Sequence, residues 1–405
     1  MFVLKIIFDC RAYLWPLRAF YEHDLYTHQI SLSFVINNKI NSFKDMEIVN
    51  DSVELIIEEG LKKIELIGKV CTKKEHNITE NSYINFVKNR IKDGHTSILA
   101  HEFVYFDIGG LVNAFFITNI LSSSDIIYKL IYYNRYIQVS NDARYIAVSY
   151  RSLLDMLINS KRNDVRKSFI NDYHLMNIII NKMWDCTPEL KSVFNIDYSM
   201  IDYIPESYTK SYINDALKRV NPNIILMNAP EIYVSTFKFI TNRAIANEII
   251  RHSEIAPMQE STRYINYSKS GDTIKFIPSY NISDYVRSKE TSSSKIAFNE
   301  IETDGYVICE QYYKDSIEIG INQQFARDIL PLGLKTELYM TGTMDMWVGE
   351  SIENNINGII IKENKGFILQ RSAKCAHPQI KRLSDKVYTL LKINYSKYYD
   401  FKSGI

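Results

Sequence analysis

The chain has few of the residues that interrupt regular structure, with only 14 glycines and nine prolines among 405 residues. This excludes a collagen-like or Gly/Pro-rich low-complexity polymer. Disorder over the whole length is also excluded, because 46% of the residues are hydrophobic and a chain of this size can bury them. We expect one large globular domain or two ordinary ones.

A surplus of positive charge is also lacking, since 48 Lys and Arg residues stand against 47 Asp and Glu residues. A general nucleic-acid surface needs such a surplus to displace counterions, so we expect no nucleic-acid partner. No apolar run reaches the roughly 18 residues of a membrane span, and the longest, at 110–121, is interrupted by polar residues. We expect no membrane association, and residues 1–8 indicate a buried strand rather than a signal peptide.

Closely spaced cysteines are absent as well. The five are scattered and form no CxxC pair, and they are Cys10, Cys71, Cys186, Cys309 and Cys375. This argues against a disulfide framework or a zinc ribbon and favours a reducing compartment. We expect no metal site.

Hydrophobic periodicity predicts most of the regular elements. Helices are expected at 52–69, 84–94, 152–158, 172–183, 242–252, 302–319 and 377–391, and strands at 2–7, 102–108, 232–240, 263–267 and 273–277. Pro257 prevents the helix at 242–252 from continuing, and Asn322 can cap a short helix that stops at Pro331. A charged, Ser-rich linker is expected at 288–294, and a polar excursion around a short apolar run at 350–365.

Four arginines lie in specific local contexts: Arg251, Arg263, Arg327 and Arg371. Glu248 lies three residues before Arg251 and four before His252, so helical spacing predicts that the three share a face. The planar guanidinium suits bidentate capture of a phosphate or an imide edge. Taken singly, a Glu–Arg pair at this spacing is more often a solvated ion pair, and a lone histidine is more often structural. The residues alone therefore predict only an anion site around Arg251 and Arg263.

Several motifs, in the same order along the chain, carry a resemblance. Arg251-His-Ser253 is followed after seven residues by Ser261, within Gln259-Glu-Ser-Thr-Arg-Tyr264. The other segments are 69–82, Gly94–His101, Phe237–Ile250, Ala326–Pro331, Lys335–Thr341 and Gly366–Ile380. Together they resemble the flavin-dependent thymidylate synthases, the ThyX family, over about residues 62–395, and the length is closest to the longer bacterial and phage members.

The resemblance implies an α/β (α+β) fold with a central, mostly antiparallel sheet flanked by helices and elaborated by insertions. Residues 1–60 would form an N-terminal strand and extension, and 61–405 the synthase-like domain with an inserted segment at about 110–230. It further implies a homotetramer with active sites built from several subunits. The location would be the cytoplasm of a bacterium or a phage-infected host.

The implied reaction methylates dUMP to dTMP, with methylenetetrahydrofolate as the carbon donor and FAD, reduced by NADPH, as the hydride donor. By the same resemblance, Arg371 is the catalytic residue at the uracil imide. The residues expected around dUMP are Glu248, Arg251, Gln259, Glu260, Ser261, Thr262, Arg263, Arg327 and Arg371. Those expected around FAD are His101, Phe103, Arg251, His252, Ser253, Thr343 and Asp345.

The departures from the family pattern gather on the flavin side. Ser253 stands in place of an arginine, which removes one expected cation contact of roughly 1–3 kcal/mol. Ala100 replaces the usual glutamate, Thr343 and Asp345 replace the common Asn and Arg, and residues 349–365 are similar to an insertion. Two alternatives therefore remain open: a related pyrimidine-nucleotide hydroxymethylase, and a non-catalytic nucleotide-binding homologue.

Overall fold

The computed structural model describes residues 5–6, 11–15, 53–110, 136–160, 173–195, 217–268, 274–278, 292–356 and 359–401. Much of the expected extension at 1–60, nearly all of the apolar run at 110–121 and part of the linker at 288–294 lie outside these residues. Of the strand expected at 2–7, the structure describes β1 (Lys5–Ile6).

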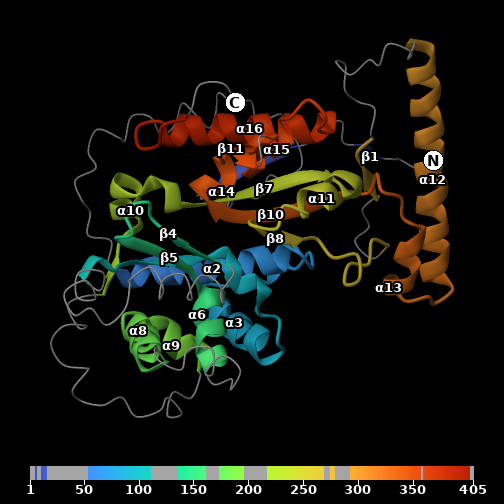
Figure 1. Cartoon of the computed structure of the whole chain (residues 1–405). Coiled ribbons are helices and arrows are strands. Elements are labelled where there is room, and N and C mark those ends of the chain that lie inside the picture. The colour runs from blue at the N-terminus through green and yellow to red at the C-terminus, as the bar shows by residue number, and fades with distance from the viewer. Residues whose placement is uncertain are drawn as a thin grey trace, which may run out of the picture.

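A four-stranded sheet forms the centre of the fold (Figure 1). Its order is β2 (Arg11–Trp15), β7 (Val234–Asn242), β10 (Lys335–Thr343) and β8 (Ala256–Gln259), and every neighbouring pair is antiparallel. Pro257 lies in β8 at the sheet edge, where a missing N–H does not interrupt the ladder. The expected antiparallel central sheet is confirmed.

Helices cover both faces of this sheet. Leu338 and Met340 of β10 belong to a core shared with α11 (Arg243–Ile249), α14 (Met344–Val348), α15 (Phe367–Arg371) and α16 (Pro378–Tyr395). Tyr339, which points to the opposite face, packs against Ile67 and Val70 of α2 (Val53–Val70). The sheet is therefore buried on both sides, which explains why β10 is apolar or buried along nearly all of its length.

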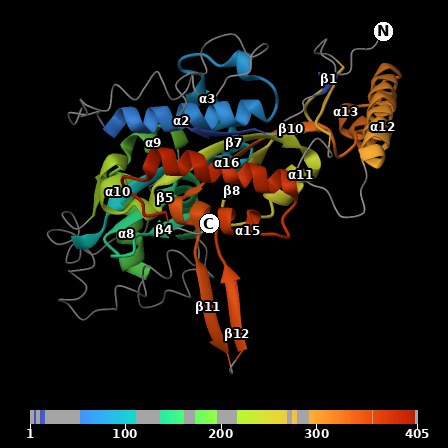
Figure 2. The ribbon, with the colours of Figure 1, turned by 90° about the horizontal axis from the view of Figure 1, so that it is seen from above.

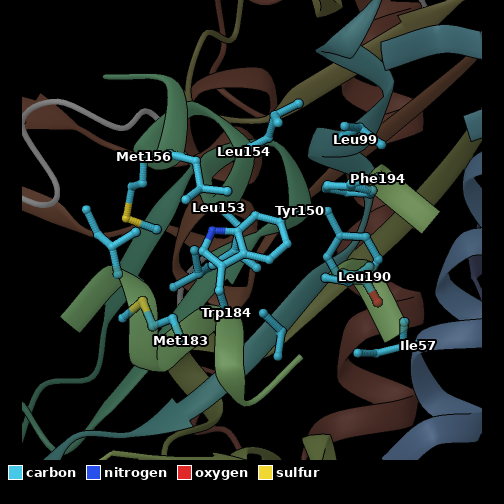
Figure 3. Packing of buried hydrophobic residues seen from close by; sticks show 14 of the residues in the cluster. Ile57, Leu99, Tyr150, Leu153, Leu154, Met156, Met183, Trp184, Leu190 and Phe194 are labelled. Carbon is cyan, nitrogen blue, oxygen red and sulfur yellow. The ribbon is translucent and has the colours of Figure 1, made fainter. Parts of the chain in front are cut away.

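A second antiparallel sheet extends the molecule, in the order β4 (Ile137–Val139), β5 (Tyr145–Ser149), β3 (Phe103–Asp107) and β6 (Lys218–Val220). The described part of the segment 110–230 supplies three of these strands and pairs with β3. Helices α3 (Ser82–Lys92), α6 (Tyr150–Ser160), α8 (Tyr173–Asp185) and α9 (Pro188–Phe194) enclose a core with it. Trp184 fills the middle of that core and meets Phe194 edge to face at 5.7 Å (Figure 3).

Two elements project from the body. The helix α12 (Ser292–Glu318) stands at one side of the molecule, next to α13 (Gln323–Ala326), as Figure 1 shows. The hairpin of β11 (Ser351–Ile356) and β12 (Ile359–Asn364) extends away in Figure 2. The region expected as a polar excursion is thus a two-stranded ribbon, and residues 292–294 of the expected linker belong to α12.

Most expected helices and strands are present. Asn322 caps α13 by accepting from Gln324 N, as expected. The strand expected at 263–267 is wrong, because these residues form turns anchored by the backbone N–H of Ser261 donating to Cys71 O at 2.8 Å. β9 (Lys275–Phe276) confirms the strand at 273–277 and pairs in parallel with β1.

Candidate functional site

The helix α11 separates two groups of the expected site residues. Asn242 begins it by accepting from Ile245 N at 2.9 Å. The helix ends at Ile249, and His252 N donates to Ile249 O at 3.0 Å in the turn that follows. The expectation that Glu248, Arg251 and His252 share one helical face is therefore wrong, because the chain reverses here to enter β8. Arg251 is exposed, whereas His252 is buried.

The first group gathers at the end of α11 around Arg371, the last residue of α15. Its Nη2 donates to the backbone carbonyl of Glu248 at 3.0 Å, and its buried Nε has no partner among the described residues. Burial and the nearby Arg251 lower the pKa of Arg371, while the Glu248 carboxylate opposes them. Burial also lowers the pKa of His377, beside Glu248. The structure thus brings Glu248, Arg251 and Arg371 together, as expected, around one donor still available.

His252 adjoins this group. Its ring meets Phe367 edge to face at 5.6 Å, and its side chain is almost fully enclosed. Burial, together with Arg371, lowers the pKa of His252 to about 4. Its Nε2 has no hydrogen-bond partner among the described residues, and the Glu254 carboxylate is too far away at 4.0 Å. A buried neutral imidazole is therefore left with one unsatisfied nitrogen.

The second group is the loop Gln259–Arg263 beyond β8. Glu260 is buried and is used inside the chain: it accepts from Tyr267 Oη at 2.9 Å and from Glu337 N at 3.2 Å, and Lys73 Nζ lies 3.3 Å away. Gln259 Nε2 reaches Thr336 Oγ1 at 3.4 Å. These bonds fix the loop from below, so Glu260 positions it rather than facing outward.

The outer side of the same loop carries the hydroxyl group of Ser261 and the positive charge of Arg263. Ser261 is half-buried, Thr262 is buried and Arg263 is exposed. The loop is bonded to the start of α11 through Arg243 and Glu260 O, whereas Arg371 is bonded near its end to Glu248 O. Within one chain, the loop and the Arg371 group therefore stand apart, at opposite ends of α11.

Arg243 is a residue that the sequence analysis missed. Its Nη1 donates to Glu260 O at 3.2 Å, so it ties the start of α11 to the loop. Burial lowers its pKa, and the nearby cation of Arg327 lowers it further. Arg243 and Arg327 are both partly buried. Two neighbouring cations of this kind favour an anion bound between them. The only sequence signal was its place near the start of the helix expected at 242–252.

A buried set of lysines and glutamates, also missed, lies under the loop. Glu337 of β10 receives Lys73, Lys335 and Lys238, the last at 2.8 Å. These cations hold the pKa of Glu337 well below its usual range, against the effect of burial. Lys73 has a left-handed backbone with φ of 54°, which no sequence pattern indicated. The set stabilises the base of the loop.

The residues expected on the flavin side are dispersed. His101, at the end of η3 (Thr96–His101), is fully buried, and its Nδ1 lies 2.8 Å from Thr341 Oγ1. Burial and the nearby Lys63 lower the pKa of His101 to about 3. Phe103 is part of a separate apolar core, and Thr343 accepts from Met346 N as the cap of α14. Asp345 accepts from Tyr399 Oη at 2.9 Å, and Ser253 is exposed.

The fit of these residues to a flavin can be judged from their unsatisfied atoms. The Nε2 atoms of His101 and His252 are both buried and without a partner among the described residues, so both can bond a polar cofactor. Phe103 and Thr343 are used within the chain, and Ser253 supplies no cation. Arg251 and His252 are adjacent after the end of α11, whereas His101 is fully buried at the end of η3, so the described residues of one chain do not gather this set around a flavin.

The described residues were also compared with the requirements of a membrane span and of a metal site. Within them, every helix is too short or too polar to cross a bilayer. No group of three or more His, Cys, Asp or Glu side chains in the described ranges is arranged to hold a metal ion.

Comparison with known proteins supports the motif assignment. Residues 203–349 match the family model "Thymidylate synthase complementing protein". The resemblance to the flavin-dependent thymidylate synthases is confirmed. The matched stretch contains α11, the loop 259–263 and β10, while Arg371 and His101 lie outside it.

A curated relative and a solved structure are also similar to parts of the chain. The "Flavin-dependent thymidylate synthase" of Synechocystis sp. is 29% identical over 124 residues, which is 29% of this chain and 55% of that protein. The chain thus spans little more than half of the length of that relative. A UMP/dUMP methylase, PolB, from Streptomyces cacaoi with bound 5-Br dUMP overlaps 42% of this chain and 74% of its own, at 15% identity and a TM-score of 0.30.

Proposed function

We propose that the protein is a flavin-dependent thymidylate synthase that methylates dUMP to dTMP. The observation that carries the proposal is the pair of arginine groups at the two ends of α11. Arg371 has a buried, unpaired Nε beside Arg251, and Arg243 lies beside Arg327 next to the loop with Ser261 and Arg263. One group suits an imide edge and the other a phosphate.

At the uracil, Arg371 does the electrostatic work. Its Nη2 is held by Glu248 O, which fixes the plane of the guanidinium and leaves Nε–H to donate. A cation at the imide favours the N3-deprotonated ring, because an opposite charge stabilises the ionised form. This raises the electron density at C5, where the new carbon is attached, and no protein nucleophile is required.

At the phosphate, the outer face of the loop supplies Ser261 and Arg263, with Thr262 and Gln259 beside them. Glu260 and Tyr267 hold the loop from beneath, so its backbone is ordered before the ligand arrives. This lowers the entropic cost of binding. Arg243 and Arg327 add charge on the adjacent side.

The two groups come from different subunits of a homotetramer in this proposal. The resemblance, which implies active sites built from several subunits, supports it. FAD, when bound and reduced by NADPH, would supply the hydride, and methylenetetrahydrofolate the carbon. His101, His252 and Arg251 are the residues that would hold FAD. The two buried imidazoles remain neutral at physiological pH, so they can hydrogen-bond without adding charge.

The proposal is tested by supplying dUMP, methylenetetrahydrofolate, NADPH and FAD and identifying the product by mass. We expect dTMP. Arg371→Ala should lower kcat about 100- to 1,000-fold, the loss typical of one donor to a developing charge. Arg151→Ala is a suitable control, because Arg151 forms an ion pair with Asp155 on α6, away from the site.

Two outcomes contradict the proposal. Formation of 5-hydroxymethyl-dUMP instead of dTMP would assign the hydroxymethylase reaction. Binding of dUMP with no turnover, in a protein that stays colourless with excess FAD, would identify a non-catalytic homologue.

A further inference from the structure

The C-terminus of α2 closes in a turn of the kind that usually contains glycine. Lys74 N donates to Lys69 O at 2.9 Å, and Lys73 N donates to Val70 O at 3.2 Å. These two bonds place Lys73 at the position after the helix where the backbone is left-handed, and its φ is 54°. A side chain is strained in this conformation, so the strain is offset by contacts that the side chain makes elsewhere.

The Lys73 side chain contacts two buried carboxylates. Its Nζ lies 2.6 Å from Glu337 Oε1 and 3.3 Å from Glu260 Oε2. Burial lowers the pKa of Lys73, but Glu260, Glu337 and the nearby Glu75 outweigh burial and raise this pKa above its usual value. The amine is therefore charged. The side chain of Glu260 is 1% exposed and that of Lys73 is 32% exposed, so Lys73 is the member of this pair next to solvent.

The same turn also holds the loop Gln259–Arg263 through its backbone. Ser261 N donates to Cys71 O at 2.8 Å, and Cys71 lies two residues before Lys73. The turn therefore contacts the loop twice, once through the backbone at Ser261 and once through the ion pair of Lys73 with Glu260. Two contacts from the end of one helix fix both the position and the orientation of the loop.

Neutralising the buried carboxylates does not by itself account for Lys73. Lys238 of β7 lies 2.8 Å from Glu337 Oε2, and Lys335 of β10 contacts Glu337 and lies 3.7 Å from Glu260 Oε2. These two lysines already bring two cations to the two carboxylates, and both are held on strands of the central sheet. Of the three lysines, Lys73 is the one outside the sheet. What it adds is a link from the end of α2 to the loop.

We infer that Lys73 is a positioning residue for the phosphate of the nucleotide. It holds Glu260, and through Glu260 it sets the place of Ser261 and Arg263 on the outer side of the loop. The inference rests on the proposed function, because it takes the phosphate to bind at this loop. A loop that is ordered beforehand loses less entropy when its ligand binds. Removal of the Lys73 cation therefore weakens binding of the phosphate and leaves binding of the base unchanged.

The test is equilibrium binding to the full-length protein. Isothermal titration calorimetry measures the Kd of dUMP, and competition measures that of deoxyuridine, which lacks the phosphate. Lys73→Met should raise the Kd of dUMP about tenfold, the loss expected for one contact to a charged group. The Kd of deoxyuridine should change by less than about twofold. Lys73→Arg should restore binding of dUMP. Lys74→Met is the matched control, because Lys74 is the exposed neighbour, and it should bind dUMP as the wild type does.

Lys73→Gly separates the charge from the backbone. Glycine adopts the left-handed conformation without strain, so this variant should keep the far-UV circular dichroism of the wild type. It should nevertheless weaken binding of dUMP as much as Lys73→Met does. In the activity assay, both variants should raise the KM for dUMP and leave kcat at saturating dUMP unchanged, which a general loss of structure would not do.

Equal Kd values of dUMP in Lys73→Met and Lys74→Met would overturn the inference. So would a tenfold loss for deoxyuridine as well, because the effect would then not belong to the phosphate. Full binding of dUMP by Lys73→Gly would also overturn it, by assigning the loss in Lys73→Met to the backbone. If the wild type forms dTMP while any of these results is found, the proposed reaction stands. Binding of dUMP that depends on Lys73, without formation of dTMP, would contradict the reaction and support the inference.

Discussion

At the scale of single residues, buried imidazoles are the groups most sensitive to conditions. His101 is fully buried beside Thr341, and its pKa is lowered to about 3 by burial and Lys63. The unfolded chain has an ordinary imidazole with a pKa of about 6.5. Between these values the unfolded state binds more protons, so stability is fully present above pH 6.5 and falls as the pH is lowered.

His101→Leu should remove this dependence. Thr341 keeps its hydroxyl partner Thr236 at 2.8 Å, so no new unsatisfied group is left there. Between pH 7.5 and 5.0 the wild type should lose about 2 kcal/mol more free energy of unfolding than the variant, from 1.4 kcal/mol per pH unit below 6.5. Urea unfolding at the two pH values measures this. His76→Gln, at an exposed histidine, should leave the wild-type difference intact. If the free energy of unfolding depends equally on pH in His101→Leu and in the wild type, protonation of His101 does not destabilise the folded state.

At the scale of elements, the base of the β11–β12 hairpin requires two glycines. Gly349 and Gly366 have φ of 78° and 91°, and a Cβ at Gly366 would lie 2.2 Å from the Cα of Gly349. Lys365 N donates to Glu350 O at 2.9 Å beside them, so the two backbones are in contact. Neither a left-handed side chain nor an added methyl group can be accommodated here without moving the hairpin.

Gly366→Ala should therefore lower the free energy of unfolding by about 3 kcal/mol, which combines backbone strain with overpacking. Gly94→Ala is the matched control. Gly94 also has a positive φ, of 73°, but nothing lies within 4 Å of its added Cβ, so only about 1 kcal/mol is expected. Urea unfolding of both variants gives the comparison. Similar losses in the two would mean that the close approach at the hairpin base is relieved by a small shift.

The same scale shows what the sequence could predict. Helices with clean periodicity and caps, such as α2, α16 and the Asn322-capped α13, form as expected because their signals are local. The strand expected at 263–267 fails because its alternating pattern is overridden by a distant anchor, the bond of Ser261 N to Cys71 O. The second sheet was not foreseen because β3 pairs with strands about 40 and 115 residues later, and such pairing has no local signal.

The candidate site also contains residues that the sequence could predict and residues that it could not. The motifs identified Glu248, Arg251 and Arg371, which the fold does bring together. Arg243 and Lys73 escaped notice because their roles arise from contacts with Glu260, on a different segment. The burial of Glu260 itself is a consequence of Lys73, Lys335 and Tyr267 converging on it, which spacing along the chain cannot show.

At the scale of the whole molecule, the separation of the two arginine groups has a measurable consequence. If the loop with Arg263 and the group of Arg371 in one active site come from different subunits, Arg263→Ala and Arg371→Ala damage different halves of that site. Each variant alone should be nearly inactive. A mixed assembly should contain some sites in which both arginines are intact, because both substitutions then fall in the partner site.

We therefore expect activity to return when the two variants are unfolded together and refolded as a mixture. For sites shared pairwise and random mixing, recovery should approach about a quarter of the wild-type rate, since half of the pairs are hybrid and one of their two sites is whole. Co-refolding Arg371→Ala with itself is the control and should recover nothing. If the mixture stays as inactive as its parents while light scattering shows that hybrids form, one chain supplies both groups, and the nucleotide then extends along α11 from Arg243 to Arg371.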